Sequence, residues 1–203
     1  MIAIFSIIIS YLLGSISFSY IIAKKIKKVD IRQHGSGNAG ATNTLRVLGV
    51  GPAIIVLLLD CAKGIVAVIL GSVLTGDPYI AAASGLASII GHNWPIYYGF
   101  RGGKGVATTV GVLAILAFYA ALISGIIAIA FIVVTRYVSL GSLIFIIGTT
   151  LITAIFGSYF NYPIYLFIFL IAIAILSVWR HRTNIQRLLK GNESKLGEKA
   201  VTK

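Results

Sequence analysis

Residues 52–74 read PAIIVLLLDCAKGIVAVILGSVL, a run that is long and apolar enough to cross a lipid bilayer as one helix. Further apolar runs occupy residues 1–23, 78–91, 105–135 and 137–179. A soluble domain of 203 residues could not hide this much apolar surface, so the sequence predicts an all-α, polytopic integral membrane protein. We expect residues 1–203 to form a single domain, because the helices of a membrane bundle have no core except one another.

The charged residues predict how this bundle is oriented. The chain has 17 lysines and arginines against five acids, a net charge of +12, and its cations are almost confined to residues 24–46, 101–104, 136 and 180–203. Cytoplasmic loops of membrane proteins are rich in Lys and Arg. We therefore expect the first 23 residues to be a retained span that starts outside, and the charged gaps and the C-terminus to lie on the cytoplasmic side of the inner membrane.

The number of spans depends on residues 105–135, which are too long for one straight helix across a bilayer. Lys104 and Arg136 both belong inside, which requires an even number of crossings between them. We therefore predict two short helices with a break near Phe118–Ala121, and a bundle of seven transmembrane helices with several short spans. A single tilted helix here would give five or six crossings and is the alternative.

The sequence argues against several classes of chemistry. Cys61 is the single cysteine, lies in an apolar stretch and is interpreted as a small buried hydrophobe. The three histidines and five acids form neither a His-x₄-Asp spacing nor a cluster suited to magnesium, so we expect no metal and no cofactor. Membrane orientation and anionic lipid headgroups explain the positive charge, so we expect membrane lipids as partners and no nucleic acid.

The first polar gap contains GSGNAGATNTLR at residues 35–46. Its glycines permit positive φ and expose backbone N–H groups, its hydroxyls and amides donate, and Arg46 carries a planar fork suited to phosphate. If the segment from Ala41 is helical, Thr42 and Arg46 share one face beside the helix N-terminus. These features favour an anion-binding loop over an ordinary connector.

The second polar gap contains GHNWPIYYGFRGGKG at residues 91–105. Glycines flank Lys104 directly before an apolar helix, an arrangement that brings backbone amides and an ammonium around phosphate oxygens. The segment does not match the nucleotide-binding P-loop, because Tyr98 stands at the first glycine position and Gly105 at the Ser/Thr position. A flexible connector with one cation is the alternative.

Weaker signals lie elsewhere in the chain. Ser139 and Ser142 open the sixth predicted span and either cap that helix or donate to a ligand. If the seventh span continues through residues 180–187, His181 and Asn184 are neighbours one turn apart. Asp60 and Lys63 are three residues apart within the second span, which leaves open a mutually satisfied pair or a direct catalytic role.

These segments together resemble the bacterial acyl-phosphate-dependent glycerol-3-phosphate acyltransferases, integral enzymes of the first step of phospholipid synthesis. In chain order, the resemblance rests on GSGNAGATNTLR from Gly35, GHNWP from Gly91, FRGGKGVAT from Phe100, SLGS from Ser139, HRTNIQR from His181 and GNE from Gly191. The apolar runs between them fit the family's seven-span architecture. The resemblance implies transfer of a fatty acyl group from acyl phosphate to glycerol 3-phosphate, with a substrate phosphate taking the hydroxyl proton and no acyl-enzyme.

The resemblance also implies roles for individual residues. The predicted catalytic residues are Ser36, Arg46, Lys104, Ser142 and His181. The predicted substrate-binding residues are Gly37, Asn38, Thr42, Asn43, His92, Gly102, Gly103, Gly105, Asn184 and Arg187. Glu193 would anchor the basic tail, and the enzyme would act as a monomer on acyl phosphate and glycerol 3-phosphate, with its site at the cytoplasmic face. A small anion or phosphate transporter is the rival function, although it would place its cations at the bilayer midplane.

Overall fold

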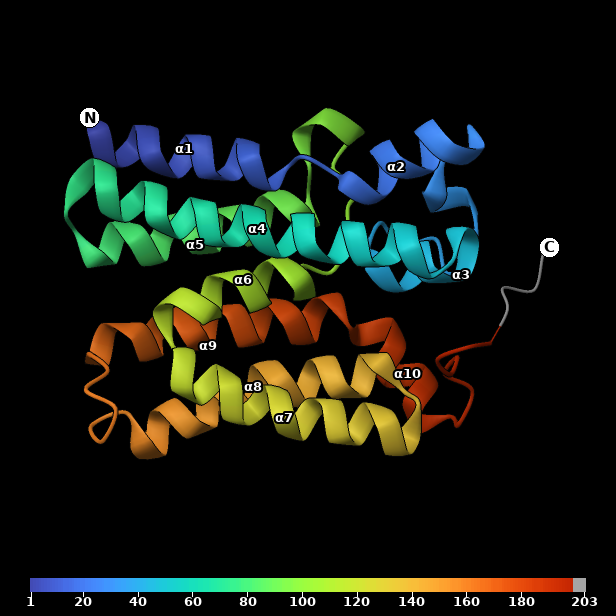
Figure 1. Ribbon diagram of the computed structural model, residues 1–203. Coiled ribbons are helices and arrows are strands. Elements are labelled where there is room, and N and C mark those ends of the chain that lie inside the picture. The colour runs from blue at the N-terminus through green and yellow to red at the C-terminus, as the bar shows by residue number, and fades with distance from the viewer. Residues whose placement is uncertain (199–203) are drawn as a thin grey trace. The chain divides into compact units, whose positions relative to one another are not determined.

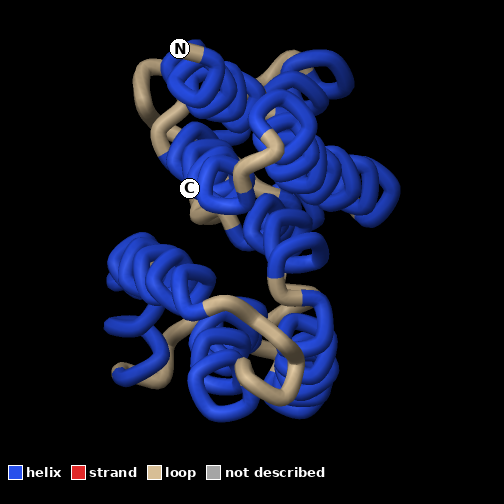
Figure 2. Tube along the Cα trace, turned by 90° about the vertical axis from the view of Figure 1, so that its left-hand side faces the viewer, coloured by secondary structure: helices blue, strands red, loops and turns tan. Residues whose placement is uncertain are grey.

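The computed structural model describes residues 1–198, which consist of helices joined by loops (Figure 2). The described α-helices are α1 (Ile2–Gly14), α2 (Phe18–Lys27), α3 (Ala41–Leu48), α4 (Val50–Thr75), α5 (Pro78–Asn93), α6 (Val106–Leu116), α7 (Phe118–Thr135), α8 (Val138–Phe156), α9 (Ile164–Arg180) and α10 (Arg182–Leu189). Two short 3₁₀ turns are η1 (Ile31–Gln33) and η2 (Ile96–Tyr98). The described chain divides into two compact units, Met1–Val112 with Gly197 and Glu198, and Leu113–Leu196.

Within the described residues, four helical segments are long and apolar enough to cross a membrane. They are Ile2–Lys27, which joins α1 and α2, Val50–Thr75, Phe118–Thr135 and Val138–Phe156. The bent pair α9 and α10 adds a fifth if it counts as one span. An all-helical membrane protein is thus confirmed, whereas the count of seven spans and the orientation of the termini stay predictions.

The long apolar run at 105–135 is divided into two helices. Helix α6 ends at Leu116 and α7 begins at Phe118, so the break falls at Ala117, at the edge of the predicted segment. Helix α6 has 11 residues, which at 1.5 Å per residue is about half of the hydrocarbon thickness. The lengths therefore favour the divided interpretation over one tilted helix.

The first unit is held together by close contacts at glycine. Helix α1 packs against α4 and α5, and α4 packs against α5 (Figure 1). A Cβ at Gly14 would collide with the Ser88 carbonyl, and one at Gly91 would collide with the Tyr11 carbonyl. Within lipid the hydrophobic effect does not drive helices together. Membrane helices therefore associate through close packing at small residues and through polar contacts. The hydroxyls of Ser6 and Ser84, 3.0 Å apart and buried, add one of these between α1 and α5.

The second unit is likewise held together by close contacts at glycine and by buried polar contacts. Helix α8 packs against both α7 and α9. Between α7 and α8, the Ser124 hydroxyl lies 3.1 Å from the Ile144 carbonyl and 2.8 Å from the Phe145 carbonyl. A Cβ at Gly148 would collide with that hydroxyl, so this glycine leaves space for the contact.

The structure decides two local points of this unit that the sequence left open. The seventh span does not continue through residue 187, because α9 and α10 meet at His181 with a bend of 60°. Ser139 does not cap α8, which begins at Val138 without a side-chain cap, and its hydroxyl instead donates to Glu193 at 2.8 Å. At Ser139 a tertiary contact with Glu193 thus takes the place of a local cap.

Candidate functional site

The first polar loop is shaped by the buried amide of Asn43. Its Nδ2 donates to the carbonyls of Ile31 at 3.1 Å and His34 at 3.0 Å, and its Oδ1 accepts from the Ser36 backbone at 2.8 Å. Gly35, with φ +60°, lies against this amide, and a Cβ there would collide with Oδ1. The sequence placed Asn43 among the substrate-binding residues. In the structure its amide forms these three hydrogen bonds with the backbone of the loop that carries Ser36.

Helix α3 carries the remaining candidates of the first loop. It begins at Ala41, so the condition under which Thr42 and Arg46 share a face is met, and the Thr44 hydroxyl donates back to the Gly40 carbonyl at 3.0 Å. Thr42 and Arg46 are half-buried and four residues apart, which places them on one face of the helix. Helix α3 therefore offers backbone N–H groups and the Thr42 hydroxyl in its first turn, and the Arg46 guanidinium one turn later on the same face. These are groups that bind phosphate.

The first and second loops meet at Gly103. This glycine is buried, and a Cβ on it would strike Nε2 of the His92 ring and stand 2.5 Å from the Ala39 carbonyl. Its N–H donates to the His92 carbonyl at 3.1 Å. The segment Gly102–Gly105 is thereby fixed beside the first loop, with Lys104 half-buried next to the contact.

Arg32 provides a second connection between the two loops. Its guanidinium pairs with Asp30 at 2.8 Å, donates to the Tyr98 carbonyl at 2.8 Å and lies 5.1 Å from the Tyr20 ring centroid. The hydrogen bond from Arg32 holds the pKa of Asp30 below its usual value. The sequence analysis gave Arg32 no role, because nothing local shows that it reaches η2.

A buried group of charged and polar side chains lies beneath these loops. Lys63 Nζ is 2.8 Å from Asp60 Oδ1 and 2.9 Å from His92 Nδ1, and all three residues are at most 6% exposed. Asp60 and Lys63 thus form a buried ion pair, and His92 lies within reach of both. Asn93 is also fully buried, and neither atom of its amide has a hydrogen-bond partner among the described residues.

In the second unit, the candidate residues gather around Glu193. Its carboxylate accepts from the Ser139 hydroxyl at 2.8 Å, from Asn184 at 2.6 Å and from Arg187 at 2.7 Å. Burial raises the pKa of Glu193, but these three donors outweigh burial and leave the pKa below its usual value. Asn184 and Arg187, predicted to bind substrate, therefore contribute here to holding the segment after α10 against the start of α8.

The two predicted catalytic residues of this unit are positioned by backbone carbonyls. His181 is 2% exposed and its Nδ1 lies 2.9 Å from the Ser177 carbonyl, one turn earlier in α9. The Ser142 hydroxyl donates to the Val138 carbonyl at 2.8 Å. Each unit thus holds its own set of the predicted residues, with the loops at 35–46 and 102–105 in the first and Ser142, His181 and Asn184 in the second.

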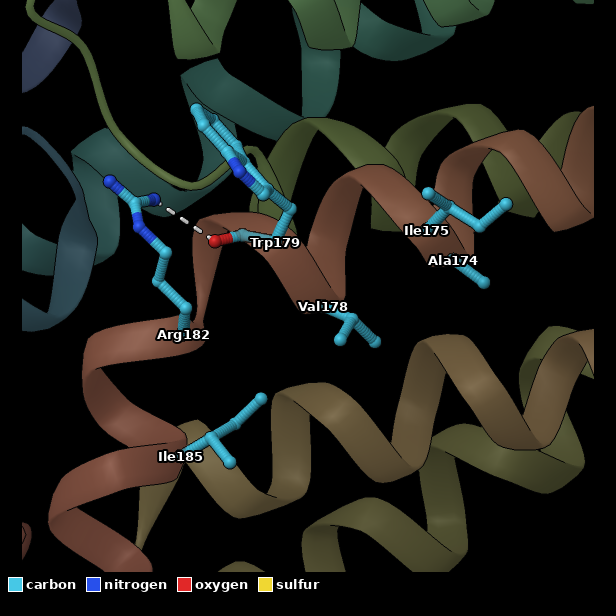
Figure 3. Close-up of a pocket in the computed structure, with 6 residues that line it drawn as sticks. All are labelled: Ala174, Ile175, Val178, Trp179, Arg182 and Ile185. Carbon is cyan, nitrogen blue, oxygen red and sulfur yellow. Dashed lines mark hydrogen bonds between the residues drawn. The ribbon is translucent and has the colours of Figure 1, made fainter.

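The bend between α9 and α10 borders an apolar groove of about 600 Å³. Its lining consists of Ala174, Ile175, Val178, Trp179, Arg182 and Ile185 (Figure 3). Arg182 stabilises the bend, because its guanidinium donates to the Trp179 carbonyl at 3.1 Å and lies 4.4 Å from the Trp179 ring centroid (Figure 3). The groove offers an aliphatic surface of the kind that lipid chains contact.

Comparisons with known proteins agree on one family. A family model described as glycerol-3-phosphate acyltransferase matches residues 4–191. The glycerol-3-phosphate acyltransferase of Halalkalibacterium halodurans is 68% identical over 195 residues, 95% of either chain, and that of Shouchella clausii is 61% identical over 196 residues, 96% of either chain. The crystal structure of PlsY (YgiH), an integral membrane glycerol 3-phosphate acyltransferase in its glycerol 3-phosphate form, superposes with a TM-score of 0.89 at 41% identity and covers 96% of both chains.

Proposed function

This chain belongs to the glycerol-3-phosphate acyltransferase family of integral membrane enzymes, and from that premise we propose that its acyl donor is an acyl phosphate and its acceptor the 1-hydroxyl of glycerol 3-phosphate. The products would be 1-acylglycerol 3-phosphate, a lysophosphatidic acid, and inorganic phosphate. A PlsY structure 39% identical to this chain is described as the lysophosphatidic acid form, which supports such a product.

The proposed reaction forms one bond and breaks one. The hydroxyl oxygen of glycerol 3-phosphate attacks the acyl carbonyl carbon, and the bond from that carbon to the phosphate oxygen breaks. The hydroxyl proton passes to a phosphate oxygen of a substrate, and phosphate departs with the electron pair. Because an acyl phosphate is already activated, positioning and neutralisation of charge supply the rate.

The observation that carries this proposal is the meeting of the two polar loops at Gly103. It brings the Gly102–Gly105 segment with Lys104 beside the loop of Ser36, in the same unit as Arg46. The first unit therefore contains backbone N–H groups, an ammonium, a guanidinium and a hydroxyl. This set of hydrogen-bond donors suits a phosphorylated substrate. We assign Lys104 and Arg46 to phosphate binding and Ser36 to a supporting hydrogen bond.

Most carboxylates of the chain are held in structural contacts, which supports a substrate group as the proton acceptor. Asp30 is bound by Arg32, Asp60 by Lys63 and Glu193 by Arg187. Asp77 accepts from the Tyr79 backbone at 2.8 Å and caps α5. Four of the five acids of the chain are thus engaged in structural contacts, so a phosphate oxygen is the better candidate for the base.

The second unit contributes to the proposal through the family motifs. We assign Ser142 to orientation of the glycerol hydroxyls or the acyl carbonyl, and His181 to a substrate phosphate. We also propose that the acyl chain contacts apolar helix surfaces open to the bilayer, and that the site faces the cytoplasm. The orientation is tested by placing a cysteine at residue 36 or 142 in a Cys61→Ala background. A membrane-impermeant thiol reagent should block this cysteine from one side of the membrane only.

The donor is tested with purified protein in detergent. Palmitoyl phosphate and glycerol 3-phosphate should together release inorganic phosphate, and neither should do so alone. Palmitoyl-CoA and a palmitoylated acyl carrier protein serve as alternative donors in parallel reactions. Transfer from a thioester but not from the acyl phosphate would overturn the proposed donor while leaving the family assignment intact.

The phosphate-binding cations are tested in the same assay. Lys104→Ala and Arg46→Ala should each lower kcat/KM at least about 100-fold, because each removes a donor that stabilises developing charge. Arg101→Ala removes an exposed cation from the same loop and should change kcat/KM less than about threefold. Folding is followed by size-exclusion chromatography, and near-normal turnover by Lys104→Ala would overturn its assignment.

A further inference from the structure

A buried ionic cluster joins three elements of the first unit. Lys63 Nζ lies 2.8 Å from Asp60 Oδ1 on α4, 2.9 Å from His92 Nδ1 on α5, and donates to the Ile16 carbonyl at 2.9 Å. Asp60 and Lys63 are 1% and 2% exposed, and His92 is 6% exposed. The cluster therefore lies inside the helix packing and is out of reach of bulk water.

Stability alone does not explain this cluster. Two charges taken out of water lose their hydration, and a buried ion pair is often matched or exceeded in stability by apolar side chains of similar volume. Ionisable residues within membrane helices are costly for the same reason, and they commonly serve a function. The contacts of His92 indicate what that function is.

A protonated Lys63 in contact with His92 Nδ1 favours the tautomer of His92 that carries its proton on Nε2. An ammonium group has donors only, so the Nδ1 atom that it contacts accepts, and the proton of a neutral ring is then on Nε2. The carboxylate of Asp60, 3.5 Å from the same Nδ1, balances the ammonium charge. The ring is thereby fixed in both tautomer and orientation.

The fixed ring lies directly against the second loop. Nε2 and Cδ2 are the ring atoms that a Cβ at Gly103 would strike, and the His92 carbonyl accepts the Gly103 N–H at 3.1 Å. A Cβ at Gly102 would collide with the same carbonyl. Both glycines before Lys104 therefore rest on His92, Gly102 on its carbonyl and Gly103 on its carbonyl and its ring. A turn of the ring would change the space that Gly103 occupies.

We propose that Lys63 and Asp60 are positioning residues for acyl transfer, which act through His92 to keep the Gly102–Gly105 segment in the conformation that presents Lys104 to a substrate phosphate. This inference rests on the proposed phosphate-binding function of that segment. Lys63 does not touch substrate in this scheme. Its ammonium fixes the orientation of the His92 ring, and the ring supports the backbone of the two glycines. The conformation of the glycines in turn fixes the position of Lys104.

The decisive variant replaces the pair with apolar residues of similar size, Asp60→Leu with Lys63→Met. It leaves no unpaired charge, so it should remain folded and monodisperse in detergent. We expect its kcat/KM to fall about 10- to 100-fold, the usual cost when a residue that orients a functional histidine is removed. Val66→Met with Ile69→Leu alters an equally spaced pair on the exposed side of α4 and should retain wild-type kcat/KM.

A double-mutant cycle separates positioning from a general structural effect. In a His92→Gln background, the apolar pair should lower kcat/KM no further, because the residue through which it acts is already gone. Additive losses would overturn the proposal. Wild-type activity of the apolar pair would also overturn it, and so would failure of both this variant and Asp60→Asn/Lys63→Gln to fold, since the cluster would then serve stability.

The protonation of His92 is measured in the wild-type protein. After labelling with ¹⁵N-histidine, the signals absent from His92→Gln should show a protonated Nε2 and an unprotonated Nδ1. A proton on Nδ1 would contradict the geometry on which the inference rests. Absence of acyl transfer by the wild type would instead refute the proposed function, so the two failures are distinguishable.

Discussion

The amide of Gly103 donates to the carbonyl of His92 at 3.1 Å, although the two residues belong to different segments of the second polar gap. The position that a Cβ of this glycine would take is occupied by the Ala39 carbonyl of the first loop and by the His92 ring. Gly103 is therefore the point at which three parts of the first unit meet, and the absence of a side chain there is a steric requirement.

Gly103→Ala should lower kcat/KM about 100-fold, because a displacement of about 1 Å in a positioning element can cost that much. The added Cβ would strike His92 Nε2 and stand 2.5 Å from the Ala39 carbonyl, so the loops must separate. Gly51→Ala is the matched control, since a Cβ there meets nothing within 4 Å. Equal activity of the two variants in the phosphate-release assay would show that the meeting point is unimportant.

Asn43→Ala should destabilise the first loop and thereby weaken substrate binding. The change leaves the Ser36 N–H and the Ile31 and His34 carbonyls without the amide that now bonds them. We expect a loss of about 1–3 kcal/mol in the free energy of unfolding, the range for a buried polar group left unsatisfied.

Asn43→Asp provides a sharper version of this experiment. It keeps the volume but places a second oxygen against the Ile31 and His34 carbonyls, where Nδ2 now donates. It should therefore be no better than Asn43→Ala in KM for glycerol 3-phosphate and in thermal stability. Wild-type behaviour of the aspartate variant would show that the amide does not organise the loop.

Glu193→Gln should remove a pH-dependent contribution to stability. The pKa of Glu193 in the folded protein lies below its ordinary value of 4.5, because its three donors outweigh burial. Its contribution is thus complete above about pH 4.5 and is lost as the pH falls through the lower folded pKa. At neutral pH we expect the variant to lose about 2 kcal/mol, the scale of a hydrogen bond to a charged group.

The measurement for Glu193 is the apparent unfolding midpoint in detergent between pH 3 and pH 7. The difference between wild type and Glu193→Gln should shrink as the pH drops below about 4.5. Glu198→Gln removes the same charge from the same tail and serves as the control. A constant difference at all pH values would mean that ionisation of Glu193 does not stabilise the tail.

Gly111→Ala should destabilise the first unit, whereas Gly125→Ala should not. A Cβ at Gly111 would collide with the Cys61 carbonyl of α4, while one at Gly125 would make an ordinary contact 3.8 Å from Phe145. Overpacking of this kind costs about 1–3 kcal/mol, and alanine is the better helix former by about 1 kcal/mol where space permits. Thermal unfolding of both variants measures the difference, and equal midpoints would contradict the close packing of α4 and α6.

Much of the architecture was predictable because its causes are local. Apolar runs of sufficient length require helices in a bilayer, since backbone groups find no water there. Pro78 at the start of α5 and Gly76 in the left-handed conformation after α4 mark a turn that composition alone indicates. The division of residues 105–135 was likewise expected, from charge.

The site was predictable only as a set of residues. Glycines, hydroxyls and cations in the polar gaps indicated phosphate binding, but their partners lie far away in sequence. Lys63 and His92 are 29 residues apart, and Ser139 and Glu193 are 54 apart. The donation of Ser139 to Glu193 could not be predicted, because local helix rules hold no information on a contact over 54 residues.

The amino-acid sequence by itself determined that this protein is an all-helical membrane protein and which loops carry its glycines, hydroxyls and cations. Hydrophobic length, charge and turn residues act over a few neighbouring positions and can be recognised without the fold. Only the tertiary structure decided that Asn43 turns inward to shape a loop, that Lys63 and Asp60 enclose His92, and that Gly103 joins two loops. These outcomes depend on how α4 and α5 pack, and burial removes the water that would otherwise compete for each polar group.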